Sequence, residues 1–240
     1  MIKLNVLKKA KADDFIVVAS LPDMGRVGGL VSSFLSQHLK TQLLAEITSS
    51  DKPWVSHSDG IVNAINDSYK IYYDKTHNLL IFTGDSQPQD PGELYRLCNT
   101  LLDYLQSIGK VKKLYGAGGY LREQVTGAPR VYGVVNRPEL KKNLAQKGIE
   151  PVGNEITTIT WFNGLILGLC REREIDAIGL FGEIAETAVP QPLAAKSILA
   201  ALSRLEALEI DTKPLDRQYE SILEEVQKKK EPSKFGPGIG

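Results

Sequence analysis

The feature that most constrains the fold is an alternation of short, β-branched apolar runs with segments of helical periodicity. Residues 15–21 (FIVVASL) form the first run, and a Pro/Gly-rich turn leads from it into apolar positions at helical spacing, Val27, Val31 and Phe34. Apolar runs of this kind are typical of strands covered on both faces. Because the alternation continues over about 200 residues, it predicts an α/β three-layer sandwich with a mostly parallel, mixed sheet.

The remaining elements are expected to follow the same order. Strands are predicted over residues 41–47, 68–74, 77–84, 111–120, 130–136 and 176–183, and helices over residues 138–147, 161–170 and 192–208. Residues 68–84 form a hairpin and so add an antiparallel edge, whereas residues 51–60 (DKPWVSHSDG) are interpreted as a loop. The strand over residues 111–120 is expected to lead into a glycine segment.

The clearest helix begins after Asp90. Asp90 has the character of an N-cap, Pro91 suits the first helical position, and Glu93 completes a capping box. A leucine-rich face follows until Gly109, which ends the helix.

The domain organisation is one core followed by an appended end. We expect an α/β core over residues 1–212, an amphipathic helix over residues 213–230 and a disordered tail over residues 231–240. The helix carries a narrow apolar stripe that includes Leu215, Tyr219, Ile222, Leu223 and Val226, which suits packing on the domain or on a neighbouring subunit. The tail is rich in lysine, proline and glycine and has too little apolar surface to order itself.

Composition excludes several classes of partner. The 29 basic residues balance the 29 acidic ones, so no overall field favours nucleic acid or an anionic membrane. Cys98 and Cys170 lie among leucines, as small buried hydrophobes do, which argues against a disulfide and for a reducing compartment. No apolar run is long enough to span a membrane. These features predict a soluble, cytoplasmic protein that binds neither nucleic acid nor membrane.

The glycine turn after the first strand raises the question of a phosphate site. Gly25, Gly28 and Gly29 fit neither the Walker pattern nor the dinucleotide spacing. Backbone N–H groups at the start of the following helix can nevertheless hold an anion. The simpler interpretation, which we favour, is a tight turn that allows close packing of helix on sheet.

The other residues with reactive or ionisable side chains give little support for catalysis. Glu183 and Glu186 follow a strand and could serve acid–base chemistry, hold a metal, cap the next helix or pair with an arginine of another subunit. His57 has serines and an aspartate beside it, but neighbours on an extended chain point to opposite faces, so a polar loop is favoured over a triad. The three histidines show no zinc-site spacing. We therefore expect no metal and no cofactor.

Trp161 and Phe162 suit a core or an interface.

Several segments, taken in order, resemble the archaeal proteasome assembly chaperone family. They are LPDMGRVGGLVSSFL, FTGDSQPQDPGELYRL, YGAGGY followed by PRVYGVV, and WFNGLILGLCREREIDAIGLFGE leading into PLAAKSILAAL, within residues 10–210. The resemblance implies a phosphorylase- or peptidyl-hydrolase-like α/β fold without the catalytic residues. It also implies homo-oligomers that bind proteasome α subunits or related assembly intermediates, with a paralogous chaperone as a further partner.

Two departures from that family concern the surface. Residues 157–164 (TTITWFNG) stand where the family usually has a small, Gly-rich segment. Some members end in a hydrophobic-Tyr-any tripeptide that docks on α subunits, whereas this chain ends in Gly238, Ile239 and Gly240. The end of this chain still offers an apolar anchor and a charge on a flexible segment. The candidate partner-binding residues are Phe235, Ile239 and Gly240, the last through its carboxylate.

The leading hypothesis is a non-enzymatic, cytoplasmic assembly chaperone that forms homo-oligomers. The alternative is a nucleotide- or small-molecule-dependent enzyme, either a hydrolase or an ATP-grasp-like ligase. It would use Gly25, Gly28 and Gly29 as its ligand loop and Glu183 or Glu186 for its chemistry.

Overall fold

The structure, a computed structural model, describes residues 2–50, 52 and 55–230. Its strands are β1 (Ile2–Val6), β2 (Phe15–Ala19), β3 (Thr41–Ser49), β4 (Val55–Ser58), β5 (Ile61–Ala64), β6 (Asp67–Asp74), β7 (Leu79–Gly84), β8 (Val111–Leu121), β9 (Val131–Val135), β10 (Glu150–Pro151) and β11 (Ala177–Ile184). Its helices are η1 (Met24–Arg26), α1 (Val27–His38), α2 (Pro91–Ile108), α3 (Leu140–Gln146), α4 (Trp161–Glu172), α5 (Pro192–Glu206) and α6 (Lys213–Lys230).

A mixed sheet forms the middle layer. Among the described residues it has nine strands in the order β1-β3-β6-β7-β2-β8-β11-β9-β10. The central strands β7, β2, β8 and β11 are parallel to one another, and the pairs β1-β3, β3-β6, β6-β7 and β11-β9 are antiparallel. The α/β prediction is confirmed, with the antiparallel share reaching beyond the expected hairpin.

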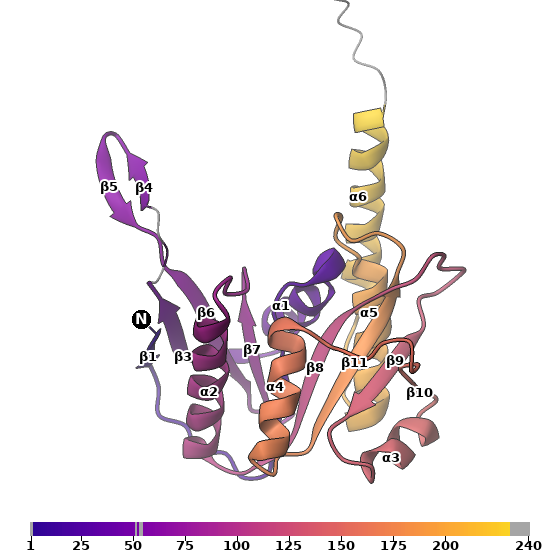
Figure 1. Cartoon of the computed structure of the whole chain (residues 1–240), viewed down its shortest axis with the longest axis horizontal. Helices are drawn as coiled ribbons and strands as arrows, with labels where there is room; N and C mark the ends of the chain where they lie inside the picture. The colour runs from indigo at the N-terminus through magenta and orange to yellow at the C-terminus, as the bar shows by residue number, and fades with distance from the viewer. Residues whose placement is uncertain (1, 51, 53–54, 231–240) are drawn as a thin grey trace, which may run out of the picture.

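Helices cover both faces of this sheet (Figure 1). Phe15, Val17 and Ala19 of β2 pack in one core with α2 and α4, whereas Ile16 and Val18 pack in the other core with α1 and α5. Side chains alternate between the faces of a strand, so an uninterrupted apolar run serves both cores at once. Each fully buried Val, Ile or Phe contributes about 1.5–3 kcal/mol through burial.

Helix α2 begins where its sequence predicts, but only half of the capping box forms, because the Glu93 carboxylate accepts from the Ser49 hydroxyl. The Asp90 side chain accepts a hydrogen bond of 2.7 Å from the backbone N–H of Glu93, Pro91 is the first helical residue, and Gly109 follows the last turn. The capping pattern is therefore a reliable local signal here.

Residues 55–64 correct one prediction. We expected a loop, but β4 and β5 pair as an antiparallel hairpin that stands away from the sheet (Figure 1). Asp59 and Gly60 at its tip both have positive φ, 51° and 77°. An Asp-Gly pair of this kind is a strong signal for a two-residue hairpin turn, and the sequence interpretation overlooked it.

Strand β8 confirms the strand predicted over residues 111–120, and it shapes the site. It runs through Gly116, Gly118 and Gly119 to Leu121. A Cβ at Gly119 would lie 2.7 Å from the Met24 carbonyl oxygen. The glycines therefore admit the loop after β2 against a continuous strand.

Strand β1 also lacks a sequence prediction. It is an edge strand that pairs with β3, and most of its residues are exposed. Its sequence IKLNV alternates apolar and polar residues, which is the pattern of a half-buried strand, and the sequence interpretation did not use it.

Helix α6 is anchored at its start and extends beyond the sheet (Figure 1). Leu215 is buried, and Lys196 of α5 donates a 2.6 Å hydrogen bond to Asp216. Further along, Leu223 is exposed. The disorder predicted for residues 231–240, and the candidate points Phe235, Ile239 and Gly240, lie outside the described residues.

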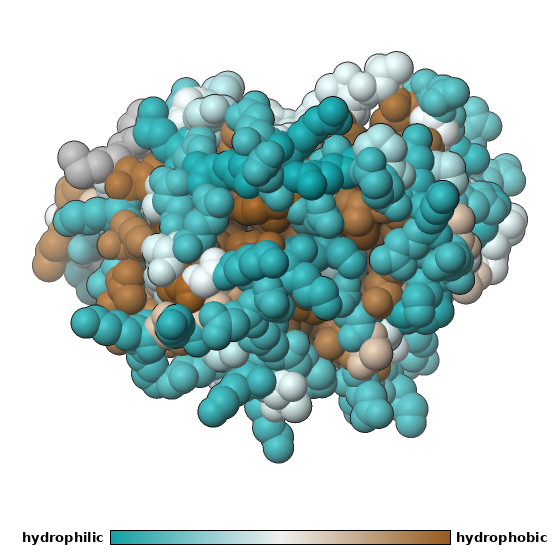
Figure 2. Space-filling model, turned by 90° about the horizontal axis from the view of Figure 1, so that it is seen from below, coloured by the Kyte–Doolittle hydropathy of each residue, from teal (hydrophilic) through white to brown (hydrophobic). Residues whose placement is uncertain are grey.

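The outer surface agrees with the balanced composition. On the face seen from below, hydrophilic side chains cover most of the surface, and apolar residues appear in patches between them (Figure 2). No helix in the described part of the chain is long and apolar enough to cross a membrane.

Candidate functional site

The candidate site is a pocket of about 740 Å³ beside the carboxyl ends of β2, β8 and β11. Open α/β sheets place their ligands at this end of parallel strands. The walls come from the loop after β2, the end of β8, residues 152–160 and the first turn of α4. Chain segments far apart in sequence therefore meet around one cavity.

Asp23 lies in the pocket wall and is held by two backbone N–H groups. Gly28 donates to Oδ1 at 2.8 Å and Gly119 donates to Oδ2 at 2.6 Å. A Cβ at Gly118 would lie 2.8 Å from Oδ2, so the missing side chain makes room for the carboxylate. Burial raises the pKa of Asp23 to about 6, although the hydrogen bonds from Gly28 and Gly119 oppose the shift.

The predicted ligand-loop glycines pack closely against the rest of the fold. Gly25 has φ 62°, its N–H donates to the Thr187 carbonyl at 3.0 Å, and its carbonyl accepts from Gln191 at 2.8 Å. A Cβ at Gly28 would lie 2.6 Å from the Ala117 carbonyl oxygen, and one at Gly29 would lie 2.8 Å from a Pro22 ring carbon.

These contacts bear on the anion hypothesis. The N–H of Gly28, at the start of α1, already donates to the Asp23 carboxylate. An external anion would meet that negative charge, so the contacts favour the tight-turn interpretation.

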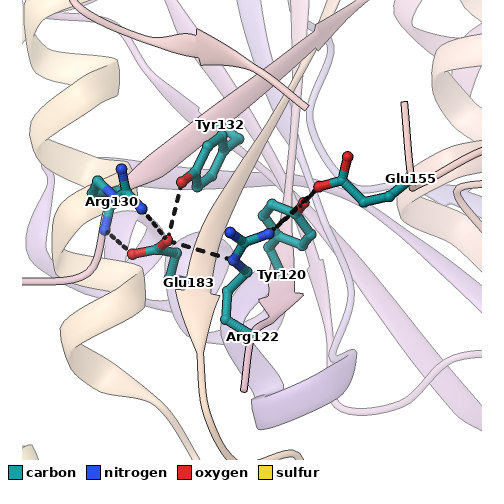
Figure 3. Close-up of polar contacts among 6 residues, drawn as sticks. All are labelled: Tyr120, Arg122, Arg130, Tyr132, Glu155 and Glu183. Atoms are coloured by element: carbon teal, nitrogen blue, oxygen red, sulfur yellow. Dashed lines mark hydrogen bonds and ion pairs between the residues drawn. The ribbon is translucent and has the colours of Figure 1, made fainter. Parts of the chain in front are cut away.

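Glu183, the second-last residue of β11, lies inside a cluster of polar contacts (Figure 3). It accepts hydrogen bonds from the Arg130 backbone N–H at 3.1 Å, the Tyr132 hydroxyl at 3.1 Å and the Arg130 guanidinium at 3.3 Å. Burial alone would raise the pKa of Glu183, but these donors outweigh it and hold the pKa below its usual range. Of the expected roles, pairing with arginine is the one observed, and the arginines belong to the same chain.

The same cluster reaches the wall of the pocket through Tyr120. The Tyr120 hydroxyl donates to Glu155 at 2.6 Å, and the Arg122 guanidinium lies over the Tyr120 ring and 3.4 Å from the same carboxylate. Figure 3 shows Arg122 between Glu155 and Glu183. Because Glu155 belongs to residues 152–160, these contacts tie that wall segment to β8.

Glu186 makes different contacts from Glu183. Its carboxylate accepts from the backbone N–H groups of Thr187 and Ala188, at 2.7 and 2.8 Å. It therefore stabilises its own turn, next to the Gly25 loop.

The two aromatic residues at the start of α4 have different environments. Phe162 is fully buried and stacks with Phe82, as expected for a core residue. Trp161 lines the pocket, is partly exposed and has φ 57°. A bulky residue in the left-handed region is strained, and such strain is concentrated at functional sites.

The histidine and cysteine residues considered as catalytic or metal-binding candidates do not form a site. His57 shares a hairpin face with Val62, and Ser56 and Ser58 lie on the other face. Cys98 and Cys170 are buried and unoxidised, and burial raises the pKa of Cys170 to about 12. The described residues contain no His, Cys, Asp and Glu cluster of the kind that holds a metal ion.

Sequence reasoning missed Asp23, although it lies in the motif that it singled out. The available signal was its position, because a polar residue directly after a buried strand lies at the edge where sites form. Tyr120 carried no comparable signal, since its role depends on residues 152–160 reaching β8.

Comparisons with known proteins agree with this fold. The model of the PAC2 family matches residues 17–230. The structure is similar to that of Pyrococcus furiosus PbaB, an archaeal proteasome activator, with 28% identity, a TM-score of 0.82, and coverage of 96% of this chain and 99% of that one.

Two further relatives are more distant. Pyrococcus furiosus PbaA, an archaeal homolog of proteasome-assembly chaperone, has 20% identity, a TM-score of 0.76 and coverage of 95% and 96%, and shares the fold. An uncharacterised protein of Methanocaldococcus jannaschii is 25% identical over 224 residues, 90% of this chain and 84% of that one. Since the family model spans most of the sequence, this chain belongs to the PAC2 family.

Proposed function

We propose that this protein is a non-enzymatic chaperone that forms homo-oligomers and binds α-type proteasome subunits during assembly or activation. The observation that carries the proposal is the match to the PAC2 family over residues 17–230, together with the likeness to the activator PbaB along nearly the whole of both chains. The same likeness is what supports proteasome subunits, rather than other proteins, as partners.

The contacts of the candidate catalytic residues favour this role over the enzyme alternative. Glu183 is engaged by Arg130 and Tyr132, Glu186 by its own turn, and the Gly28 N–H by Asp23. A hydrolase or ligase would have to break these contacts before using the same groups on a substrate.

The proposal assigns partner contact to the end of the chain. Helix α6 begins on α5 through Leu215 and Asp216 and then extends away from the domain. In this proposal the segment after Lys230 supplies Phe235 and Ile239 as apolar anchors for a partner's pocket.

The test is co-purification of the full-length protein with recombinant α-type subunits. We expect the full chain to retain the α subunits and a chain ended after Lys230 to retain less of them. The double substitution Phe235→Ala and Ile239→Ala should reproduce the loss, whereas Lys234→Ala serves as a matched change within the tail. Absence of α-subunit binding by the full chain would refute the proposal, and equal binding by the truncated chain would refute the role of the tail.

Homo-oligomerisation is tested separately by native mass spectrometry of the purified protein, alone and with α subunits. A monomer at micromolar concentration would contradict that part of the proposal. Addition of a paralogous chaperone in a third sample would show whether a second subunit is required.

A further inference from the structure

The pocket contains one charged side chain that the proposed chaperone role does not use. Of the described residues that line it, Asp23 is the only Asp, Glu, Lys or Arg. The volume of about 740 Å³ lies within the range of about 300–1,000 Å³ typical of small-molecule sites. A single carboxylate in such a cavity restricts which ligand the cavity can accept.

The surroundings of Asp23 leave its negative charge without a cation. Its hydrogen bonds come from backbone N–H groups, and no Lys or Arg of the described chain is paired with it. Arg122, which follows Leu121 of the pocket wall, is engaged by Glu155 and Tyr120, and Arg130 by Glu183. An anion supported by neutral dipoles alone is incompletely compensated, so a bound cation would be favourable.

Aromatic side chains lie beside this carboxylate. A Cβ at Gly118 would lie 2.8 Å from Asp23 Oδ2 and 3.0 Å from the Phe181 ring, so both groups border the space above the same glycine. Tyr120 and Trp161 line the same pocket. Aromatic rings attract cations through their faces, and the attraction adds to that of the carboxylate.

The rim of the pocket is unusually apolar for an exposed surface. Met24, Leu121, Ile156 and Trp161 all line it, and they are 45%, 48%, 41% and 46% exposed. Exposed apolar side chains that gather around a cavity mark a binding site, and the strained backbone of Trp161 points the same way. The ligand should therefore carry an apolar body as well as a charge.

We propose that this pocket binds a small organic cation, a primary amine carried on an apolar chain. The ammonium group pairs with Asp23, and the chain packs between Trp161, Ile156 and Phe181. The proposal goes beyond the chaperone role and is independent of it, because no partner subunit enters the argument.

The experiment measures binding of n-hexylamine to the full-length protein by the fluorescence of Trp161. A Trp54→Phe substitution removes the signal of the second tryptophan, and 1-hexanol and hexanoate serve as neutral and anionic probes of similar size. We expect n-hexylamine to bind at least tenfold more tightly than either. Equal binding of the three probes, or binding of none, would overturn the proposal.

Two variants separate the role of the charge from that of the fold. Asp23→Asn should weaken n-hexylamine binding at least tenfold, while Asp59→Asn, in the exposed turn of the β4–β5 hairpin, should leave it unchanged. Circular dichroism checks that both variants are folded. Unchanged binding by a folded Asp23→Asn variant would overturn the proposal.

A pH titration of the unsubstituted pocket supplies a test that needs no change at Asp23. With a pKa of about 6, Asp23 is largely ionised at pH 7.5 and about nine-tenths protonated at pH 5, whereas the amine stays charged. Affinity for n-hexylamine should therefore fall about tenfold between these pH values. The charged groups joined to the Tyr120 wall of the pocket, Arg122, Glu155 and Glu183, are paired, and the directions of their pKa shifts keep them charged in this range. A pH-independent affinity contradicts the proposal, and so does binding of a lysine-containing peptide without binding of the free amine.

Discussion

Two acidic residues at the same edge of the sheet, Asp23 and Glu183, have opposite environments. Glu183 has a guanidinium, a tyrosine hydroxyl and a backbone N–H around its carboxylate. Asp23 has backbone N–H groups and, among the described residues, no lysine or arginine paired with it. The pKa of Glu183 is held below its usual range, and that of Asp23 is raised to about 6.

The difference separates a structural acid from an available one. A carboxylate with a full set of partners stabilises the fold and has little left to offer a ligand. A carboxylate that remains short of a cation costs stability in the free protein and gains it on binding. Substitutions at the two sites should therefore affect different measurements.

The largest effect is expected for Glu183→Ala. Its removal leaves the Tyr132 hydroxyl and the Arg130 backbone N–H without their acceptor, so the free energy of unfolding should fall by about 2–4 kcal/mol. Urea unfolding at pH 7.5 measures it. The matched change Glu186→Ala, in an exposed turn, should cost less than about 1 kcal/mol. Equal losses for the two variants would show that Glu183 is not the structural acid of the pair.

Gly28→Ala tests the packing that holds Asp23 in place. The new methyl group would lie 2.6 Å from the Ala117 carbonyl oxygen and 2.7 Å from that of Leu21, and we expect a loss of about 1–3 kcal/mol. Gly168→Ala in α4 has open space around its Cβ and should instead stabilise the protein by up to about 1 kcal/mol. Thermal unfolding compares both variants, and a neutral Gly28→Ala would remove the packing argument.

The ionisation of the two acids should change the free energy of unfolding in opposite directions. Asp23 has a raised pKa in the folded state, so its ionisation lowers stability as pH rises toward and through about 6, by about 1 kcal/mol between pH 5 and 7. Glu183 has a lowered folded pKa, so its contribution is present above its ordinary pKa and is lost as pH falls below it. Urea unfolding of the wild type and of Asp23→Asn across pH 4–7.5 should differ by this decline. Parallel profiles would contradict the raised pKa.

The smallest effect is expected for Glu155→Gln, which weakens the link between residues 152–160 and β8. Exposed ion pairs contribute little to global stability, so the unfolding midpoint should not change. Hydrogen exchange of residues 152–160 should become faster, because the contacts of Glu155 with Tyr120 and Arg122 hold this wall of the pocket. Glu150→Gln, in β10 just before that segment, is the control. Unchanged exchange in both variants would show that the wall is held by its apolar contacts.

Local signals in the sequence predicted much of the fold. The capping residues around Asp90 defined α2, and the β-branched run before Pro22 defined β2, because short-range sterics and hydrogen bonding decide such elements. The β4–β5 hairpin also had a local signal, in Asp59 and Gly60, that was not used. Strand β1 had one as well, in the alternation of IKLNV, although its pairing with β3 depends on residues about 40 positions away.

The order of the elements could be predicted from the sequence, and so could the resemblance to a proteasome assembly chaperone family, through the order of the motifs. The sequence did not distinguish Asp23 from Glu183, because each is an acid at or just beyond the end of an apolar strand. Only the tertiary structure brought the Gly119 N–H to Asp23 across 96 positions and Arg130 to Glu183 across 53. The charge state and availability of a carboxylate depend on groups within a few ångströms in space, and distance along the chain does not reveal them.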